Sequence, residues 1–332
     1  MVILKSICIS HKEDVDGIVS AALLQNGLKI KNIFLVDYPN LLNVLDFVIS
    51  ICARNRDFTR VFICDLGLNK KNENLFVEKL SVLKSRDIDI IYIDHHYLEP
   101  EIKQRIISLG IKLVHDIEEC TSVQIYYLLR KRLRRSFSFF AAAAALTDYM
   151  DGKMKAKQLV KKYDRTFLML ESCYLSYVIS SSQRNIEFLK LISRKISTGM
   201  MPHDIKNSCK LVKDFSSKIA NAISAIEQKS IHMKNISYYQ HDLDLPSSMI
   251  VNFVLGLSNK KVGIAYKLKS NMNSYILSIR GSKECSTHLG KLVNELSVEF
   301  DGSGGGHDKA CGALIPQTRF TEFLSKLNES IQ

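Results

Sequence analysis

Ile90-Ile91-Tyr92-Ile93-Asp94-His95-His96-Tyr97 is the stretch that decides the fold, because a run of β-forming residues leads directly into three polar side chains. A buried strand that ends in Asp94-His95-His96 would deliver these groups to the carboxyl edge of a sheet. Ligands bind at that edge in open α/β sheets. Three polar residues after a strand are by themselves more often a turn than a site, so other segments have to decide between the two.

Two other segments end in the same kind of side chain. An apolar segment over residues 2–9 runs into His11, Asp14 and Asp16, and another over residues 60–64 runs into Asp65. The carboxyl ends of neighbouring parallel strands share one edge of a sheet. Three strands that each end in acidic or histidine side chains therefore indicate a single site.

The apolar residues alternate between strand and helix periodicity over the first 150 residues. Strands are predicted over residues 2–9, 31–36, 60–64, 88–93 and 111–114, and helices over residues 17–28, 41–53, 72–84, 100–109 and 122–132. Strands separated by helices pair in parallel. The pattern therefore predicts an α/β fold with an N-terminal doubly wound parallel sheet that is covered on both faces.

The second half of the chain has a different pattern. An alanine-rich helix is predicted over residues 139–146, followed by helices almost throughout residues 153–230 with a break at Pro202. Strands return over residues 231–239, 262–268 and 274–280, with helices over residues 248–257, 285–296 and 318–331. The predicted domains are residues 1–175, a helical connector over residues 176–230, and a smaller α/β C-terminal domain over residues 231–332.

Composition narrows the class of protein. The 332 residues are 46% hydrophobic, and no apolar stretch approaches the ~20 residues of a membrane span, so no membrane association is expected. The chain enters a strand pattern at once, which predicts no signal peptide. Eight scattered cysteines without a Cys-x-x-Cys pair favour free thiols and a cytoplasmic protein. The net charge of +12 favours an anionic partner such as nucleic acid, or a solvated lysine-rich surface.

The order of these motifs resembles that of a known family. The motifs are His11-Lys12-Glu13-Asp14-Val15-Asp16-Gly17, Asp65, Asp94-His95-His96, Asp148 and Gly304-Gly305-Gly306-His307. They resemble the successive signatures of the DHH phosphoesterase family, which includes RecJ-type single-strand exonucleases, small-oligonucleotide phosphodiesterases and family II inorganic pyrophosphatases. The glycine-rich motif resembles that of members with a DHH-associated C-terminal domain.

The resemblance implies a site for two Mn²⁺ or Mg²⁺ ions. His11 and Asp14 would hold one ion, Asp16, His95 and Asp148 the other, and Asp65 would bridge them. Asp94 and His96 would be catalytic, with His96 facing the phosphate and Asp94 orienting a neighbouring side chain. Carboxylates with a few imidazoles suit these ions better than zinc, and a pair of such ions supports phosphodiester hydrolysis.

Two positions in this set leave alternatives open. Lys12 and Glu13 separate His11 from Asp14, whereas family members usually have one or three residues there. Either His11 is a ligand or Glu13 substitutes for a neighbour. Asp151 is the alternative to Asp148, because it would lie on a similar face if the preceding helix continued.

The substrate-binding residues come from the second domain. Gly304, Gly305, Gly306 and His307 would clamp the substrate together with Arg280, in a cleft between the two domains, although a glycine cluster can also be a flexible loop. The basic run over residues 130–135 is either a solvated helix end or a phosphate track. Tyr97, Tyr149, Tyr238 and Tyr239 are candidates for base stacking, against the alternative of packing on the core.

These observations predict a metal-dependent hydrolase of single-stranded DNA or RNA or of short oligonucleotides, similar to a RecJ-like exonuclease or an oligoribonuclease. One alternative is a phosphatase or phosphodiesterase of small nucleotides, such as a cyclic dinucleotide or phosphoadenosine phosphate. The other is a non-catalytic RecJ-fold scaffold with replication or repair partners. The sequence leaves the oligomeric state open.

Overall fold

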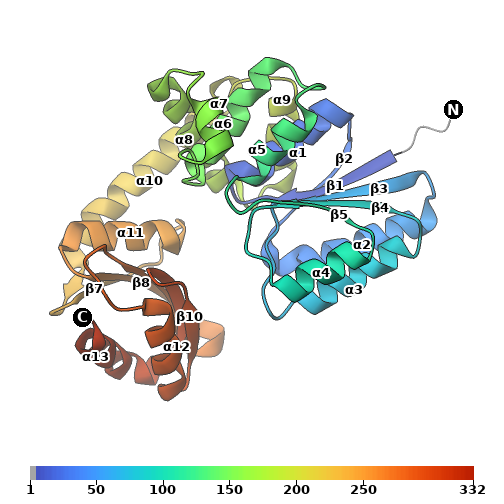
Figure 1. Cartoon of the computed structure of the whole chain (residues 1–332). Helices are drawn as coiled ribbons and strands as arrows, with labels where there is room; N and C mark the ends of the chain where they lie inside the picture. The colour runs from blue at the N-terminus through green and yellow to red at the C-terminus, as the bar shows by residue number, and fades with distance from the viewer. Residues whose placement is uncertain (1–4) are drawn as a thin grey trace. The chain divides into compact units, whose positions relative to one another are not determined.

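A computed structural model describes residues 5–332 and divides the chain into two compact units, Met1–Lys213 and Asp214–Gln332 (Figure 1). The division falls inside helix α10 (Ser208–Lys229). This helix belongs to the segment that the sequence predicts as a helical connector. The three predicted domain ranges stay a prediction.

The first unit is built on a five-stranded parallel sheet in the order β2-β1-β3-β4-β5. Its strands are β1 (Lys5–His11), β2 (Asn32–Val36), β3 (Phe58–Cys64), β4 (Asp89–Asp94) and β5 (Lys112–His115). All five strands lie where the sequence predicts them, and residues 2–4 of the first predicted strand lie outside the described residues. The strand order reverses between β1 and β3, and this switch point is where doubly wound folds bind ligands.

Helices cover both faces of this sheet, as the sequence predicts (Figure 1). The strands alternate their side chains, so that Ile9 and Ile63 face one layer while Cys8 and Phe62 face the other. The first layer consists of α2 (Leu41–Arg54), α3 (Glu73–Lys84) and α4 (Pro100–Ser108). The second contains α1 (Val15–Leu28), α5 (Thr121–Leu129) and α6 (Ser138–Thr147).

The helical segment after the sheet is confirmed, and one predicted helix is too long. The helices α7 (Met154–Val160), α8 (Arg165–Ser182), α9 (Ile186–Ser197) and α10 follow, with Pro202 in a short 3-10 turn. The helix predicted over residues 122–132 ends at Leu129. It ends there because the chain turns inward to bury Leu133 and Phe137.

The second unit has a mixed six-stranded sheet in the order β10-β11-β9-β8-β7-β6. Its core lies between this sheet and two amphipathic helices, α12 and α13, while α11 contacts β7, β8 and β9. The strands are β6 (Ile231–His232), β7 (Ile236–Gln240), β8 (Val262–Lys269), β9 (Ser274–Gly281), β10 (Ser303–Gly306) and β11 (Ala310–Pro316). The helices are α11 (Ser247–Ser258), α12 (Leu289–Glu299) and α13 (Phe320–Ser330). The smaller α/β C-terminal fold is thus confirmed.

Two details of the second unit differ from the sequence prediction, and one alternative that the sequence leaves open is decided. The strand predicted over residues 231–239 is a hairpin, because Met233 N–H bonds to the Ile236 carbonyl and β6 turns back along β7. The helix predicted from residue 285 begins at Leu289. The glycine cluster, for which a flexible loop was one alternative, forms strand β10 because it pairs with β11.

Two predictions from composition can be compared with the structure. Among residues 5–332, no helix combines the length and the apolar character that a membrane span requires. The eight cysteines are all free thiols, of which six are buried while Cys173 and Cys209 are exposed.

Candidate metal centre

Acidic and histidine side chains gather at the carboxyl edge of the first sheet. His11 is the last residue of β1, Asp65 follows β3, and Asp94 ends β4 just before His95. Asp14 and Asp16 lie at the start of α1, and Asp148 lies at the end of α6. The topology therefore brings together side chains that are more than 130 residues apart in the sequence.

These side chains form three overlapping groups whose potential ligand atoms lie within 4.8 Å of one another. The groups are His11-Asp14-Asp65, Asp65-His95-His96 and Asp16-His95-Asp148. Asp65 and His95 each belong to two groups. All six residues predicted as metal ligands are thus present in one connected cluster.

Three buried polar atoms in this cluster have no hydrogen-bond partner: His11 Nε2, Asp65 Oδ2 and Asp148 Oδ2. Buried polar atoms are almost always hydrogen-bonded, so three unpartnered atoms in one cluster indicate a missing partner. All three atoms are metal ligands by type, and the cluster as a whole is rich in oxygen with some imidazole nitrogen. This set fits Mn²⁺ or Mg²⁺.

The irregular first motif still brings its His and Asp together. Asp14 caps helix α1 by accepting from Gly17 N–H at 2.9 Å, and its other oxygen lies 2.9 Å from His11 Nδ1. Glu13 lies 3.7 Å from His11 Nε2, on the other side of the ring. The geometry places both His11 and Asp14 in the cluster and adds Glu13 as a close neighbour.

Asp148, and not Asp151, points to the cluster. Asp148 Oδ2 lies 3.5 Å from His95 Nε2. Asp151 instead forms an ion pair with Arg165 at 3.5 Å. The helix α6 ends at Thr147, so Asp151 does not lie on the same helical face as Asp148.

Asp65 lies at the middle of the cluster, where it is 1% exposed. Its carboxylate is 3.3 Å from His95 Nε2 and 3.8 Å from His11 Nδ1. Burial by itself would raise the pKa of Asp65, but the imidazoles of His11 and His95 hold it well below its usual range. Asp65 is therefore an anion between two imidazoles, which is the charge state that a bridging ligand needs.

Two other carboxylates of the cluster, Asp16 and Asp148, have raised pKa values because they are buried near other acids. Both oxygens of Asp16 accept backbone N–H groups at the start of α5, from Thr121 at 2.7 Å and Ser122 at 2.8 Å. Burial, with the charge of Asp65, nevertheless raises the pKa of Asp16 to about 7. Burial and the neighbouring acids raise the pKa of Asp148 to about 9. Bound cations would relieve this repulsion.

The pKa values of the histidines are also raised, here by the neighbouring carboxylates and against the effect of burial. Burial by itself would lower the pKa of His11, but the carboxylates of Asp14, Asp65 and Glu13 raise it to about 12. Burial would also lower the pKa of His95, but the carboxylates of Asp65 and Asp16 raise it to about 9. Without metal the cluster therefore retains protons, which cations would displace.

His96 is held by a network that the sequence reveals only in part. Asp94 Oδ1 is 2.9 Å from His96 Nδ1, as expected for an orienting carboxylate, and Tyr92 O–H donates to Asp94 Oδ2 at 3.1 Å. Tyr38, which sequence reasoning missed, places its hydroxyl 3.1 Å from His96 Nε2 and its ring against His11. The available signal was that β2 ends at the same edge, just before Tyr38.

The candidate substrate residues of the second unit lie at the same end of three neighbouring strands, β9, β10 and β11. Arg280, near the end of β9, pairs with Ala310 of β11, and His307 N–H bonds to the carbonyl of the same Ala310 at 2.8 Å. Gly305 and Gly306 have φ values of 143° and 146°, which only glycine adopts readily. The backbone thus places His307 and Arg280 near each other, with His307 exposed.

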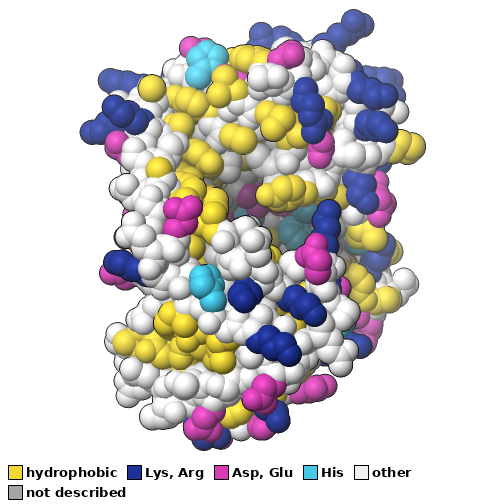
Figure 2. All heavy atoms as spheres, turned by 90° about the vertical axis from the view of Figure 1, so that its left-hand side faces the viewer, with side chains coloured by type: hydrophobic (Ala, Val, Ile, Leu, Met, Phe, Trp, Pro, Cys, Tyr) yellow, Lys and Arg dark blue, Asp and Glu magenta, His cyan; other side chains and the backbone are white. Residues whose placement is uncertain are grey.

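The basic run over residues 130–135 lies at the far end of α5 from the metal centre. Thr121 and Ser122 bind Asp16 at the start of this helix, and the run begins about 13 Å away, after its last turn. All of its cations are exposed. On the face drawn in Figure 2, Lys and Arg side chains are scattered among acidic and uncharged ones. The exposure of these cations and their position at the far end of α5 favour a solvated helix end over a phosphate track.

Comparison with family models identifies the class of protein. Residues 6–151 match the N-terminal domain of the DHH family, and residues 245–332 match the DHHA1 domain. The chain therefore belongs to the DHH family and has the fold of its phosphoesterases, and the candidate metal centre lies within the residues that match the N-terminal domain.

Particular relatives are distant in sequence. Uncharacterized protein MJ0831 of Methanocaldococcus jannaschii is 24% identical over 194 residues, which cover 55% of this chain and 43% of that protein. The pGpG-specific phosphodiesterase PggH from Vibrio has a TM-score of 0.62 at 11% identity, covering 97% of this chain and 98% of its own. Exonuclease RecJ bound to manganese has a TM-score of 0.59 at 15% identity, with coverages of 98% and 90%. CDC45 from Entamoeba histolytica has a TM-score of 0.52 at 10% identity, with coverages of 98% and 95%.

Proposed function

We propose that this chain is a divalent-metal-dependent phosphodiesterase that hydrolyses single-stranded nucleic acid or short oligonucleotides. The observation that carries this proposal is the set of three unpartnered buried atoms, His11 Nε2, Asp65 Oδ2 and Asp148 Oδ2, within a cluster of acids and imidazoles. A structural cluster would satisfy these atoms internally. Buried atoms without a partner, in overlapping groups of acids and imidazoles, suit ligands for cations.

The ligands would be His11, Asp14, Asp16, Asp65, His95 and Asp148, with Asp65 shared. Two Mn²⁺ or Mg²⁺ bound there would supply an activated water and stabilise charge on phosphate oxygens. Asp94 fixes the His96 ring through Nδ1. Burial opposes protonation of His96, but the bond to Asp94 raises its pKa, so that its Nε2 can donate to a phosphate oxygen. In the structure, the hydroxyl of Tyr38 lies 3.1 Å from His96 Nε2.

The choice of substrate rests on charge and on the second unit. A net charge of +12 favours a polyanion. Arg280 and His307 add a fork-shaped cation and an imidazole at one sheet edge, and the neighbouring glycine backbone permits close approach of a phosphate. The similarity in length and fold to a pGpG-specific phosphodiesterase supports a very short substrate, and the similarity to RecJ supports a longer single strand. Eight free thiols are consistent with a reducing compartment such as the cytoplasm.

One specific observation supports a second candidate function. The similarity to CDC45 is compatible with a non-catalytic member of a replication complex. Such a scaffold has no need of a complete ligand set. Because every acid and histidine of the predicted set is present and gathered in one cluster, hydrolysis is the better supported function.

Labelled single-stranded DNA and RNA of about two to about twenty-four nucleotides, incubated with Mn²⁺ or with a chelator, test the proposal. We expect cleavage with Mn²⁺ only, and a loss of more than about 100-fold in the Asp65→Asn variant. Asp151→Asn is the matched control, because it makes the same change outside the cluster and should keep full activity. Absence of cleavage together with absence of Mn²⁺ binding would favour the scaffold.

A further inference from the structure

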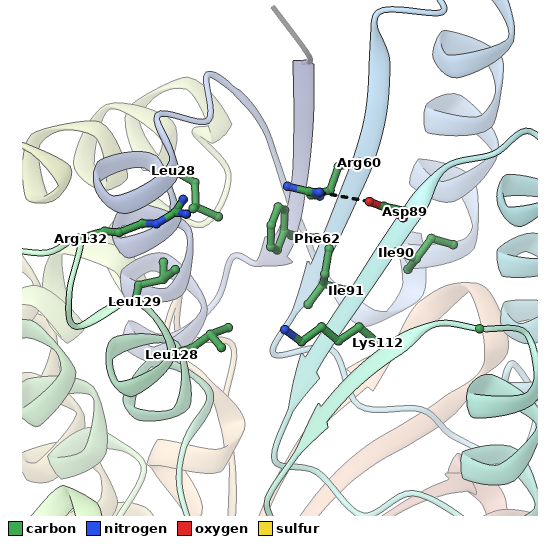
Figure 3. A pocket seen from close by; sticks show the side chains of 11 residues that line it. Leu28, Arg60, Phe62, Asp89, Ile90, Ile91, Lys112, Leu128, Leu129 and Arg132 are labelled. Atoms are coloured by element: carbon green, nitrogen blue, oxygen red, sulfur yellow. Dashed lines mark hydrogen bonds and ion pairs between the residues drawn. The ribbon is translucent and has the colours of Figure 1, made fainter.

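A cavity of about 400 Å³ lies at the amino edge of the first sheet, opposite the edge that carries the metal centre. One wall comes from the starts of β3, β4 and β5, and the other from the ends of α1 and α5. Figure 3 shows these two walls facing each other across the cavity. Nothing in the proposed hydrolysis uses this space.

The inner part of the cavity is apolar and includes one aromatic ring. Phe62 and Ile91 are neighbours on β3 and β4, and both point toward the helical wall (Figure 3). Leu28, Leu128 and Leu129 form that wall. Phe62 and Leu129, which are 4% and 7% exposed, belong to the same hydrophobic core, so these side chains form the inner surface of an apolar slot. An aromatic ring suits such a surface.

The rim of the cavity is cationic. Arg60, Lys112 and Arg132 line it with a single acid, Asp89. Arg60 is paired with Asp89 at 3.1 Å. In the described part of the chain, Lys112 and Arg132 form no ion pair, and they approach the cavity from opposite walls (Figure 3). Two unpaired cations beside an apolar slot favour an anionic ligand.

We propose that this cavity binds a nucleoside monophosphate, with the base on the apolar surface formed by Phe62 and the leucines and the phosphate held by Lys112 and Arg132. The volume lies within the ~300–1,000 Å³ range of small-molecule sites. Arginine binds phosphate through two parallel N–H groups, and lysine adds a point charge. Arg132 is the residue of the exposed basic run that lines the cavity. The site is separate from the metal centre, and the proposal holds whether or not the chain is a hydrolase.

Calorimetric titration of the full-length, metal-free protein with adenosine 5′-monophosphate tests the site. We expect saturable binding that weakens by about tenfold in Lys112→Gln and in Arg132→Gln, as for loss of a charged hydrogen bond. Arg130→Gln is the matched control, because this neighbouring arginine does not line the cavity, and it should bind like the wild type. Asp65→Asn should also bind normally, which separates this site from the metal centre.

Two further measurements define the class of ligand. Adenosine and inorganic phosphate should each bind more weakly than the nucleotide, because each meets only one part of the site. Leu128→Trp should fill the slot and block binding, with an unchanged circular dichroism spectrum showing that the protein is folded. The proposal is overturned if the nucleotide does not bind, if Lys112→Gln and Arg132→Gln bind it like Arg130→Gln, or if phosphate binds as tightly as the nucleotide.

Discussion

Asp65 combines a functional position with a strained backbone. Its φ of 57° lies in the left-handed region, which costs a residue with a side chain roughly 1–2 kcal/mol. This backbone conformation turns the chain sharply after β3 and places the Asp65 carboxylate between His11 and His95. Strained residues of this kind are concentrated at functional sites. Here the strained residue is one of the two, with His95, that belong to two of the three candidate metal-ligand groups.

The pKa values of the cluster predict how metal binding depends on pH. Without metal, His11, with a pKa of about 12, and His95 and Asp148, each about 9, hold protons at neutral pH. A cation must displace these protons, because metal ligands bind in their deprotonated form. As pH rises toward 9 fewer protons compete, so the affinity for Mn²⁺ should increase, by up to about tenfold per pH unit for each proton displaced.

Titrations with Mn²⁺ at about pH 6.5 and about pH 8.5, in buffers of different ionisation enthalpy, measure both the affinity and the number of protons released. Equal affinity at the two pH values, with no proton release, would contradict the prediction.

Tyr149 is another residue whose conformation suggests a role. It follows Asp148, has a φ of 57° and is 92% exposed. An exposed ring held in a strained conformation beside a candidate metal ligand is well suited to stack on a substrate base, and stacking contributes about 1–3 kcal/mol per base. On the proposed function, Tyr149→Ala should weaken oligonucleotide binding about tenfold, while Tyr149→Phe keeps the ring and the affinity. Equal binding by the two variants in a fluorescence titration would exclude stacking.

At the scale of elements, the sequence predicts what depends on local pattern. The five strands of the first sheet are correct because each is a run of β-forming residues between helical segments. The sequence allows both a clamp and a loop for the glycine cluster, because β10 forms only by pairing with β11, which follows it. Local pattern does not predict the contact between Tyr38 and His96, because the two residues are 58 positions apart. The positions of the acids and histidines at strand ends could be predicted from the sequence. The contacts between side chains from different strand ends, such as that of Tyr38 with His96, could not.

The junction between β1 and α1 depends on Gly17. A Cβ atom at this position would lie 2.3 Å from the carbonyl oxygen of His11, so only glycine allows α1 to begin so close to the end of β1. Gly17→Ala should therefore push apart the elements that carry His11 and Asp16. We expect a loss of stability of about 1–3 kcal/mol and weaker Mn²⁺ binding.

Gly152→Ala is the matched control for Gly17→Ala, because an added Cβ meets no atom within 4 Å. Thermal denaturation with and without Mn²⁺ compares the two variants. If both variants melt at the wild-type temperature, the close contact between residue 17 and His11 does not limit stability, and the prediction is wrong.

At the scale of the whole molecule, the two units have different sheets and different candidate roles. The first unit has a parallel sheet with the acids and imidazoles at the carboxyl ends of its strands. The second has a mixed sheet with Arg280 and His307 at one end of its strands. Within the described residues, every group with metal-ligand geometry belongs to the first unit. This separation makes metal binding and substrate binding independently measurable.

Arg280→Ala and His307→Ala should therefore weaken oligonucleotide binding while the protein retains its bound Mn²⁺. Each variant removes a group that would hydrogen-bond a phosphate, so the affinity should fall by about tenfold or more. His232→Ala is a suitable control, because it removes a histidine from the same sheet. His232 lies on β6, and β6 and β10 are the two opposite edge strands of this sheet. Oligonucleotide titration and metal analysis on the same samples separate the two effects. Loss of Mn²⁺ from Arg280→Ala or His307→Ala would show that the second unit also stabilises the metal centre, and the proposed separation of roles would then be wrong.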